Sequence, residues 1–172
     1  RRVNPRAIFF DMDDTLLDTS GGVAEAWATT CQAFSVDLGC DAEELNKAIR
    51  AQMLAFWRDE AAVEHWRTKL HEARAHNVES ALAAQGLDTS RAKLLADRYW
   101  EEQFYRRFFP ATMAMCLRRT DDREEAMSIV NNGFMRVFKK IHLFSFKGSL
   151  EGWVRRLVWH SLADYFRDKQ KY

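Results

Sequence analysis

The chain has 172 residues, of which 47% are hydrophobic and 30% are charged. This composition excludes a disordered chain and an integral membrane protein, and a chain of this length forms one good hydrophobic core or two small ones. No apolar run approaches the roughly 20 residues that a membrane-spanning helix needs. Only seven Gly and two Pro are present, which predicts long helices with few turns.

The net charge of +1 conceals an unequal distribution along the chain. Residues 104–172 contain fourteen Lys/Arg and seven Asp/Glu, a net of +7, whereas residues 1–103 contain twelve and eighteen, a net of −6. Such asymmetry predicts two modules with different partners, the basic one a candidate for binding a polyanion. A solvated basic face is the alternative interpretation.

Three cysteines, Cys31, Cys40 and Cys116, form no CxxC pair. The basic N-terminal stretch is followed by acidic residues rather than by a cleavage site, so we expect no signal peptide. Reduced thiols without a leader predict a cytoplasmic protein.

The first half begins with one strand and continues as helices. The apolar run 7–10 predicts a buried strand that delivers acidic residues at its carboxyl end. Apolar residues at helical spacing then predict four helices. The first carries Val23, Trp27, Cys31 and Phe34; the second follows a capping box at Asp41 and Glu44; the third runs from about Ala61 to near Gly86; and Asp88 or Ser90 caps the fourth.

The second half reads as further helices. The helical pattern continues to Pro110, which we expect to begin a new helix or to kink the old one. Two helices follow, separated by Thr120-Asp121-Asp122, and an Asp caps the second. A loop spans Phe144 to Ser149, and a last helix spans Leu150 to Arg167. We therefore predict a mostly α fold, a helical bundle with at most one short strand at the N-terminus.

The segment Phe9-Phe10-Asp11-Met12-Asp13-Asp14-Thr15-Leu16 resembles the first motif of the haloacid dehalogenase-like (HAD) hydrolases, and the resemblance extends through a helical cap region to about Gln103. It implies Asp11 as the nucleophile that becomes an aspartyl-phosphate and Asp13 as the acid and base. It also implies Mg²⁺ at Asp11 and Asp13, because a carboxylate attacks phosphorus only when a cation offsets their repulsion.

The later motifs of that family are missing. Asn131, in Ile129-Val130-Asn131-Asn132-Gly133, stands where a hydroxyl is needed, and no strand ending in Gly-Asp follows. A metal held by one motif has few ligands. We therefore expect Asp11 and Asp13 to be a relic of a catalytic site, and we favour the interpretation that the protein is not an enzyme. A Mg²⁺-dependent phosphohydrolase stays an alternative.

From Phe104 onward the chain resembles the second conserved region of extracytoplasmic-function (ECF) sigma factors. The matching segments are Phe104-Tyr105-Arg106-Arg107-Phe108-Phe109-Pro110, Leu117-Arg118-Arg119, Asp122-Arg123-Glu124-Glu125-Ala126, Gly133-Phe134-Met135-Arg136-Val137-Phe138, Gly148-Ser149-Leu150-Glu151-Gly152-Trp153 and Asp164-Tyr165-Phe166-Arg167. The resemblance implies a helical module that binds the clamp helices of RNA polymerase and melts the promoter −10 element.

The same resemblance implies site residues. Val130, Asn131 and Phe134 would face polymerase; the DNA-binding set would be Phe144, Phe146, Lys147, Arg155, Arg156, His160 and Arg167. Aromatic rings stack on unpaired bases and cations neutralise phosphates, which suits this task. His160 departs from the family, which usually has Asn there. The chain ends at Tyr172 without a region for the −35 element, so we expect no −35 recognition from these residues.

We interpret the whole as a chimera of 1–103, a HAD-like motif with cap helices, and 104–172, a sigma-like domain. Recombination in the laboratory or in evolution would produce it, and the well-kept parental patterns favour the laboratory. A fold-only chimera without activity is a further alternative. Apolar residues left without partners, at Phe56-Trp57 and Tyr99-Trp100, predict a homo-oligomer as one way to cover them. No membrane partner is expected.

Overall fold

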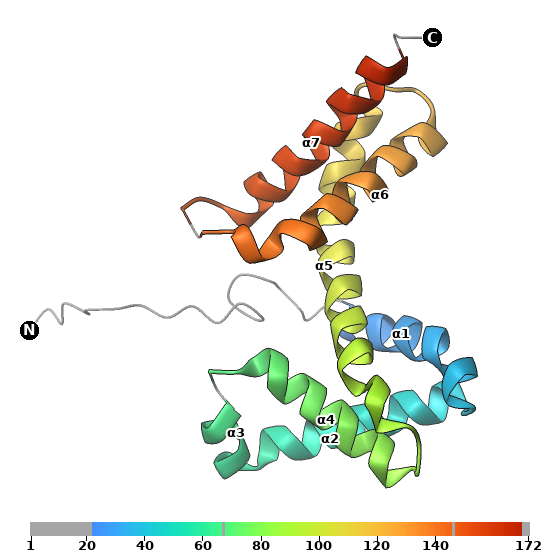
Figure 1. Ribbon diagram of the computed structural model, residues 1–172, viewed down its shortest axis with the longest axis vertical. Coiled ribbons are helices and arrows are strands. Elements are labelled where there is room, and N and C mark those ends of the chain that lie inside the picture. Colours follow the sequence, from blue (N-terminus) through green and yellow to red (C-terminus); the bar gives the residue numbers. More distant parts are fainter. Residues whose placement is uncertain (1–21, 67, 146, 170–172) are drawn as a thin grey trace, which may run out of the picture. The chain divides into compact units, whose positions relative to one another are not determined.

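The computed structural model describes residues 22–66, 68–145 and 147–169, and every regular element in these ranges is helical (Figure 1). The prediction of a mostly α protein is confirmed. The strand expected at 7–10, with Asp11 and Asp13 after it, lies outside the described residues. The chain divides into two compact units, Arg1–Gln103 and Phe104–Tyr172. None of the described helices is long and apolar enough to span a bilayer.

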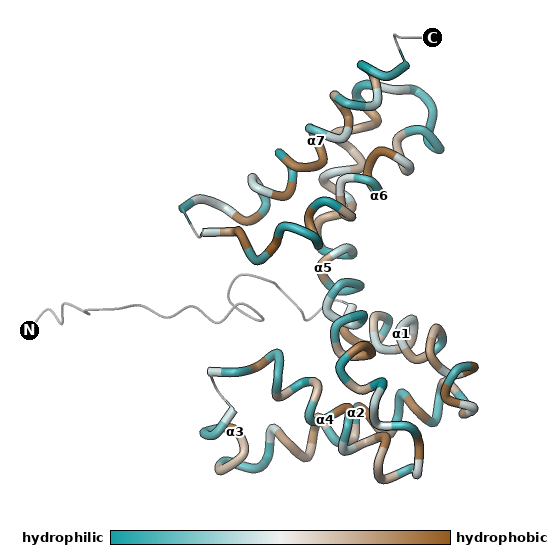
Figure 2. The backbone as a smooth tube through the Cα atoms, viewed as in Figure 1, coloured by the Kyte–Doolittle hydropathy of each residue, from teal (hydrophilic) through white to brown (hydrophobic). Residues whose placement is uncertain are grey.

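The first unit is built from helices around one apolar core. Its elements are α1 (Val23–Leu38), α2 (Ala42–Arg58), α3 (Glu60–Trp66), α4 (Leu70–Ala84), the 3-10 turn η2 (Thr89–Arg91) and the first part of α5 (Ala92–Leu117). At the centre Trp27 stacks on Tyr99, with ring centroids 3.9 Å apart and planes 12° apart. Such a pair contributes about 0.5–1.5 kcal/mol beyond the apolar area it buries. Brown and teal alternate along the helices in Figure 2, as expected of amphipathic helices that bury one face.

Helix ends in this unit follow the local sequence. Gly39 ends α1 in the left-handed region at φ 65°, where a residue without a Cβ is favoured. Asp41 then begins α2, because its carboxylate accepts hydrogen bonds from the amides of Glu43 and Glu44 at 2.9 and 3.0 Å. Asp88 accepts in the same way from the amide of Ser90, at the start of η2. The caps at Asp41 and Asp88 are where the sequence predicts them, although Asp88 caps the turn η2 that precedes α5 rather than α5 itself.

The third predicted helix is wrong as a single element, because the chain breaks it into α3 and α4. Lys69, the residue before α4, has φ −134° and ψ 46°, which is not helical. The break lets Trp66 stack on His76, with ring centroids 5.3 Å apart. An unbroken helix would separate residues ten apart by about 15 Å along its axis, so this stacking requires the turn.

Pro110 does not begin a new helix, since α5 runs through it from Ala92 to Leu117. Proline has no amide hydrogen, so Pro110 cannot donate the helical hydrogen bond to the carbonyl of Arg106. Both residues are exposed, so water can take the place of that donor. Two residues on, the hydroxyl of Thr112 donates to the carbonyls of Phe108 and Phe109 at 2.9 and 3.0 Å.

The second unit consists of the rest of α5 from Phe104, α6 (Arg123–Lys140), the 3-10 turn η3 (Ile141–Leu143) and α7 (Leu150–Lys169). Asp122 caps α6 by accepting from the amides of Glu124 and Glu125, as predicted. Rings of α5 and α6 meet in the core, where Phe104 lies 4.7 Å from Phe108 and 6.5 Å from Phe134, centroid to centroid. The helix α7 packs against α6 along its length (Figure 1).

The apolar residues predicted to lie at a homo-oligomer interface differ in their burial. Phe56 and Tyr99 are buried within the first unit, whereas Trp57 is 58% exposed. Only an exposed residue such as Trp57 is available to a second copy in this structure.

Two of the three cysteines lie in the core. The thiols of Cys31 and Cys116 are buried, and burial raises the pKa of Cys31 to about 12 and that of Cys116 to about 11. Both thiols therefore stay protonated at neutral pH and act as small core residues.

Candidate nucleic-acid interface

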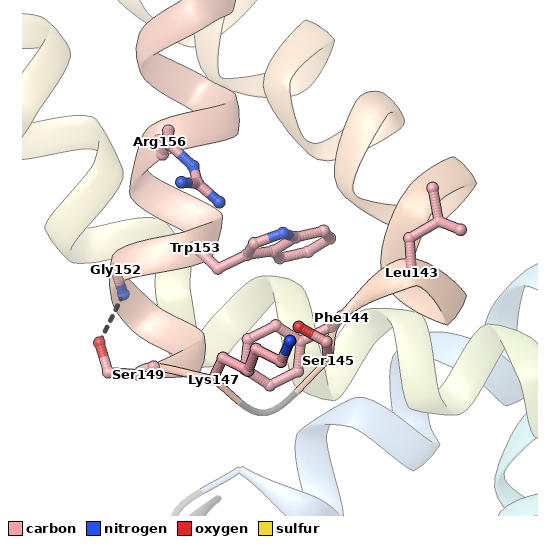
Figure 3. Close-up of a pocket in the computed structure, with 9 residues that line it drawn as sticks. Leu143, Phe144, Ser145, Lys147, Ser149, Gly152, Trp153 and Arg156 are labelled. Atoms are coloured by element: carbon pink, nitrogen blue, oxygen red, sulfur yellow. Dashed lines mark hydrogen bonds between the residues drawn. The ribbon is translucent and has the colours of Figure 1, made fainter.

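An open pocket of about 450 Å³ lies between the loop that follows η3 and the first turns of α7 (Figure 3). This volume is in the range of sites that hold small organic groups, about 300–1,000 Å³. We refer to it as the loop pocket. It is lined by Leu143, Phe144, Ser145, Lys147, Gly148, Ser149, Gly152, Trp153 and Arg156.

Ser149 fixes the junction between the loop and α7. Its hydroxyl accepts a hydrogen bond from the amide of Gly152 at 3.0 Å, and its carbonyl accepts from the amide of Trp153 at 3.1 Å. A Cβ at position 152 would lie 2.8 Å from the Ser149 hydroxyl oxygen and would displace it from this cap. The Ser-x-x-Gly spacing therefore both starts the helix and keeps this side of the pocket open.

Two aromatic rings form the apolar part of the pocket. Phe144 of the loop and Trp153 of α7 lie with centroids 5.5 Å apart and planes tilted by 55°. Figure 3 shows Trp153 projecting from α7 toward the loop that carries Phe144. Because the two rings already touch, an incoming planar group stacks on their outer faces rather than between them. Trp153, which was not among the predicted DNA-binding residues, is half-buried and lines this pocket.

The cations of the pocket differ from those around it. Lys147 and Arg156 line the pocket and have no acidic partner within the described residues. Arg155 instead pairs with Glu151 at 3.6 Å. Arg167 is an ion-pair partner of Asp164, whose carboxylate also meets Arg136 at 2.6 Å. Two positive charges that no acidic side chain of the described residues neutralises therefore lie beside the aromatic pair.

Helix geometry separates the predicted DNA-binding residues into two sets. Arg156, His160 and Arg167 follow Trp153 by three, seven and fourteen residues, so these four side chains share one stripe of α7, on which the three basic residues are exposed. Arg155 is rotated by about 100° from Arg156 and lies off that stripe. Phe144 and Lys147 come from the loop and join the stripe at the pocket. Phe146 lies outside the described residues.

The residues predicted to meet polymerase are divided by burial. The side chains of Val130 and Phe134 are 0% and 2% exposed and belong to the core of the second unit, so they are not available to a partner in this structure. Asn131 is exposed, and its side-chain oxygen accepts from the Tyr105 hydroxyl at 2.9 Å. Met135, one turn beyond Asn131, was not among the predicted residues and is 56% exposed. Its spacing of four residues from Asn131 places it on the same side of α6, off the buried stripe.

A metal centre finds no support in the described part of the chain, where no group of three or more His, Cys, Asp or Glu side chains is placed to hold an ion. Asp11 and Asp13, for which the HAD resemblance implies Mg²⁺, lie outside that part. That assignment stays a prediction.

The second unit is thus a small helical domain with an aromatic and basic pocket beside one helix. Its residues, 104–172, match the family model of Sigma-70 region 2. The match covers the unit from its first residue, Phe104, and supports the sigma-factor part of the sequence interpretation. No curated protein and no solved structure matches the chain.

Proposed function

We propose that residues 104–172 act in transcription initiation as a sigma-factor module of the ECF type, which binds core RNA polymerase and single-stranded promoter −10 DNA. The observation that carries the proposal is the loop pocket, together with the family match over the same unit. Its aromatic pair offers a stacking surface for an unpaired base, worth about 1–3 kcal/mol per base. Two cations of the pocket, Lys147 and Arg156, have no acidic partner among the described residues, and their positive charge attracts the negatively charged strand.

Polymerase binding is assigned to the exposed side of α6 around Asn131 and Met135. An exposed methionine beside a polar amide suits a protein interface, because thioethers adapt to an apolar partner surface. The neighbouring Val130 and Phe134 support this surface from beneath as core residues. We propose that they act through the position of α6 rather than by direct contact.

The test of DNA binding uses fluorescence anisotropy with a labelled single-stranded −10 oligonucleotide and the full chain. Binding that falls as salt rises, and that weakens with Phe144→Ala, supports the proposal. Leu54→Ala is the matched control, because Leu54 is an exposed apolar side chain of the first unit, 54% accessible. Absence of binding at low salt contradicts the DNA part of the proposal.

The test of polymerase binding is co-purification with bacterial core enzyme. Met135→Glu places a charge on the proposed surface and should abolish co-purification, whereas Val36→Glu, at an 87% exposed position of the first unit, should not. Circular dichroism checks that both variants stay folded. Equal retention of the two variants would remove the α6 surface from the proposal and leave the DNA pocket untouched.

A further inference from the structure

The side chains that line the loop pocket are rich in hydrogen-bond donors and poor in acceptors. Lys147, Arg156 and the Trp153 indole nitrogen can only donate. Among the side chains that line the pocket, the only oxygen acceptors are the hydroxyls of Ser145 and Ser149, and Ser149 already accepts from Gly152. No carboxylate or carboxamide lines it. A ligand edge that faces these side chains is therefore favoured when it offers acceptors, because a donor there would find few partners.

Arg156 is the residue best placed to read a ligand here. It lies one turn beyond Gly152 on α7, and Figure 3 shows its guanidinium above the Trp153 ring, on the side of the pocket. No acidic side chain of the described residues occupies its donors. A guanidinium presents two parallel N–H groups, which pair with two acceptors that are adjacent on one edge of a planar ligand.

Only some bases offer two adjacent acceptors. Guanine does so with O6 and N7, and cytosine with O2 and N3. Adenine places its amino donor beside N7 and beside N1, and thymine separates its two carbonyls by an N–H. We infer that the loop pocket selects guanine or cytosine over adenine and thymine, with Arg156 as the residue that determines this preference. The inference rests on the proposed DNA binding and specifies the base that is held.

The experiment measures the affinity of the full chain for four labelled oligothymidine strands that carry A, C, G or T at one central position. We expect the strand with guanine or cytosine to bind about tenfold more tightly than the strand with adenine, the effect of one good bidentate pair. Arg156→Lys keeps the charge and removes the paired donors, so it should abolish the preference while the strands still bind. Arg155→Lys is the matched control, because Arg155 is the neighbouring arginine on another face, paired with Glu151, and it should keep the preference.

The outcomes separate this inference from the function on which it rests. If all four strands bind equally and Arg156→Lys changes nothing, DNA binding stands and the base preference is overturned; tighter binding of adenine overturns it as well. If no strand binds at low salt, the proposed function fails together with the inference. A preference for guanine that is lost with 7-deazaguanine, which lacks the N7 acceptor, supports pairing at O6 and N7. A preference for cytosine supports pairing at O2 and N3.

Discussion

Gly133 of α6 lies so close to Val158 of α7 that a Cβ at position 133 would come within 2.7 Å of Val158 Cγ2 and 2.9 Å of its Cα. The second contact is with backbone, so rotation of the Val158 side chain cannot relieve it. This glycine sets how closely the two long helices of the second unit approach each other. It belongs to Gly133-Phe134-Met135-Arg136-Val137-Phe138, one of the segments that carry the resemblance to sigma factors.

Gly133→Ala should therefore destabilise the second unit by about 1–3 kcal/mol, the usual cost of overpacking a core. Helix propensity alone predicts the opposite sign, because Ala is favoured over Gly in a helix by about 1 kcal/mol. Asn132→Ala, at the exposed neighbouring position, is the control and should change the free energy of unfolding little. Urea denaturation of both variants measures the difference, and a stabilised Gly133→Ala would show that the helices are less closely packed.

A second prediction concerns acid stability. The Glu125 carboxylate near the start of α6 accepts hydrogen bonds from Lys169 and Tyr165 of α7 and from Thr120, and together these lower its pKa from 4.5 to about 2. A lowered pKa contributes stability that is present above pH about 4.5 and is lost as the pH falls toward about 2. Glu125→Gln should flatten the decline of thermal stability in this window. Glu124→Gln, whose side chain makes none of these bonds in the described part of the chain, should leave it unchanged.

A third prediction separates two basic residues by their salt response. Lys147→Ala should reduce the slope of log affinity against log salt for single-stranded DNA by about 0.7, the value for one phosphate contact, because Lys147 lines the loop pocket and has no acidic partner among the described residues. Arg155→Ala should change the slope less, because Arg155 is already paired with Glu151. Anisotropy titrations at several salt concentrations measure both slopes. A larger effect of Arg155→Ala would place the phosphate path on the opposite flank of α7.

A fourth prediction addresses the acidic motif of the N-terminal segment. We expect no turnover of a generic phosphate ester with Mg²⁺, because the lysine and distal acids that the HAD mechanism uses have no counterpart in the sequence. The measurement is release of phosphate or nitrophenolate by purified protein, with Asp11→Asn as the control for contaminating activity. Turnover that Asp11→Asn abolishes would make the phosphohydrolase alternative the better description of the first half.

Local rules predicted much of the fold. The side-chain acceptors Asp41, Asp88 and Asp122 begin helical segments where the sequence places them, since a cap needs only residues two or three positions away. The break between α3 and α4 was not predicted, because apolar residues continue at helical spacing across it. The stacking of Trp66 on His76 that accompanies the break is a tertiary contact between two helices, which local sequence patterns do not reveal. Of the two alternatives predicted at Pro110, the start of a new helix is wrong, because α5 continues through it; the sequence could not choose between them, since the tolerance of a proline within a helix depends on exposure of the carbonyl that loses its donor.

The candidate site was predicted in part. The loop and last helix were identified correctly as elements, but the sequence could not say that Arg156 lines a pocket while Arg155 pairs with Glu151. Nor could resemblance distinguish exposed Asn131 from buried Val130 and Phe134. Adjacent residues of one helix point in different directions, and their burial depends on the position of the second helix.

The cap at Ser149 has an evolutionary consequence. The amides of Gly152 and Trp153 donate hydrogen bonds to Ser149 and so join the loop to α7. Ser145 and Lys147, in the same loop, are exposed and lie outside the core. Substitutions at those two positions alter what the pocket offers to a ligand while leaving the packing of α6 against α7 intact. Ligand recognition by this domain can therefore change during evolution with little effect on the stability of its fold.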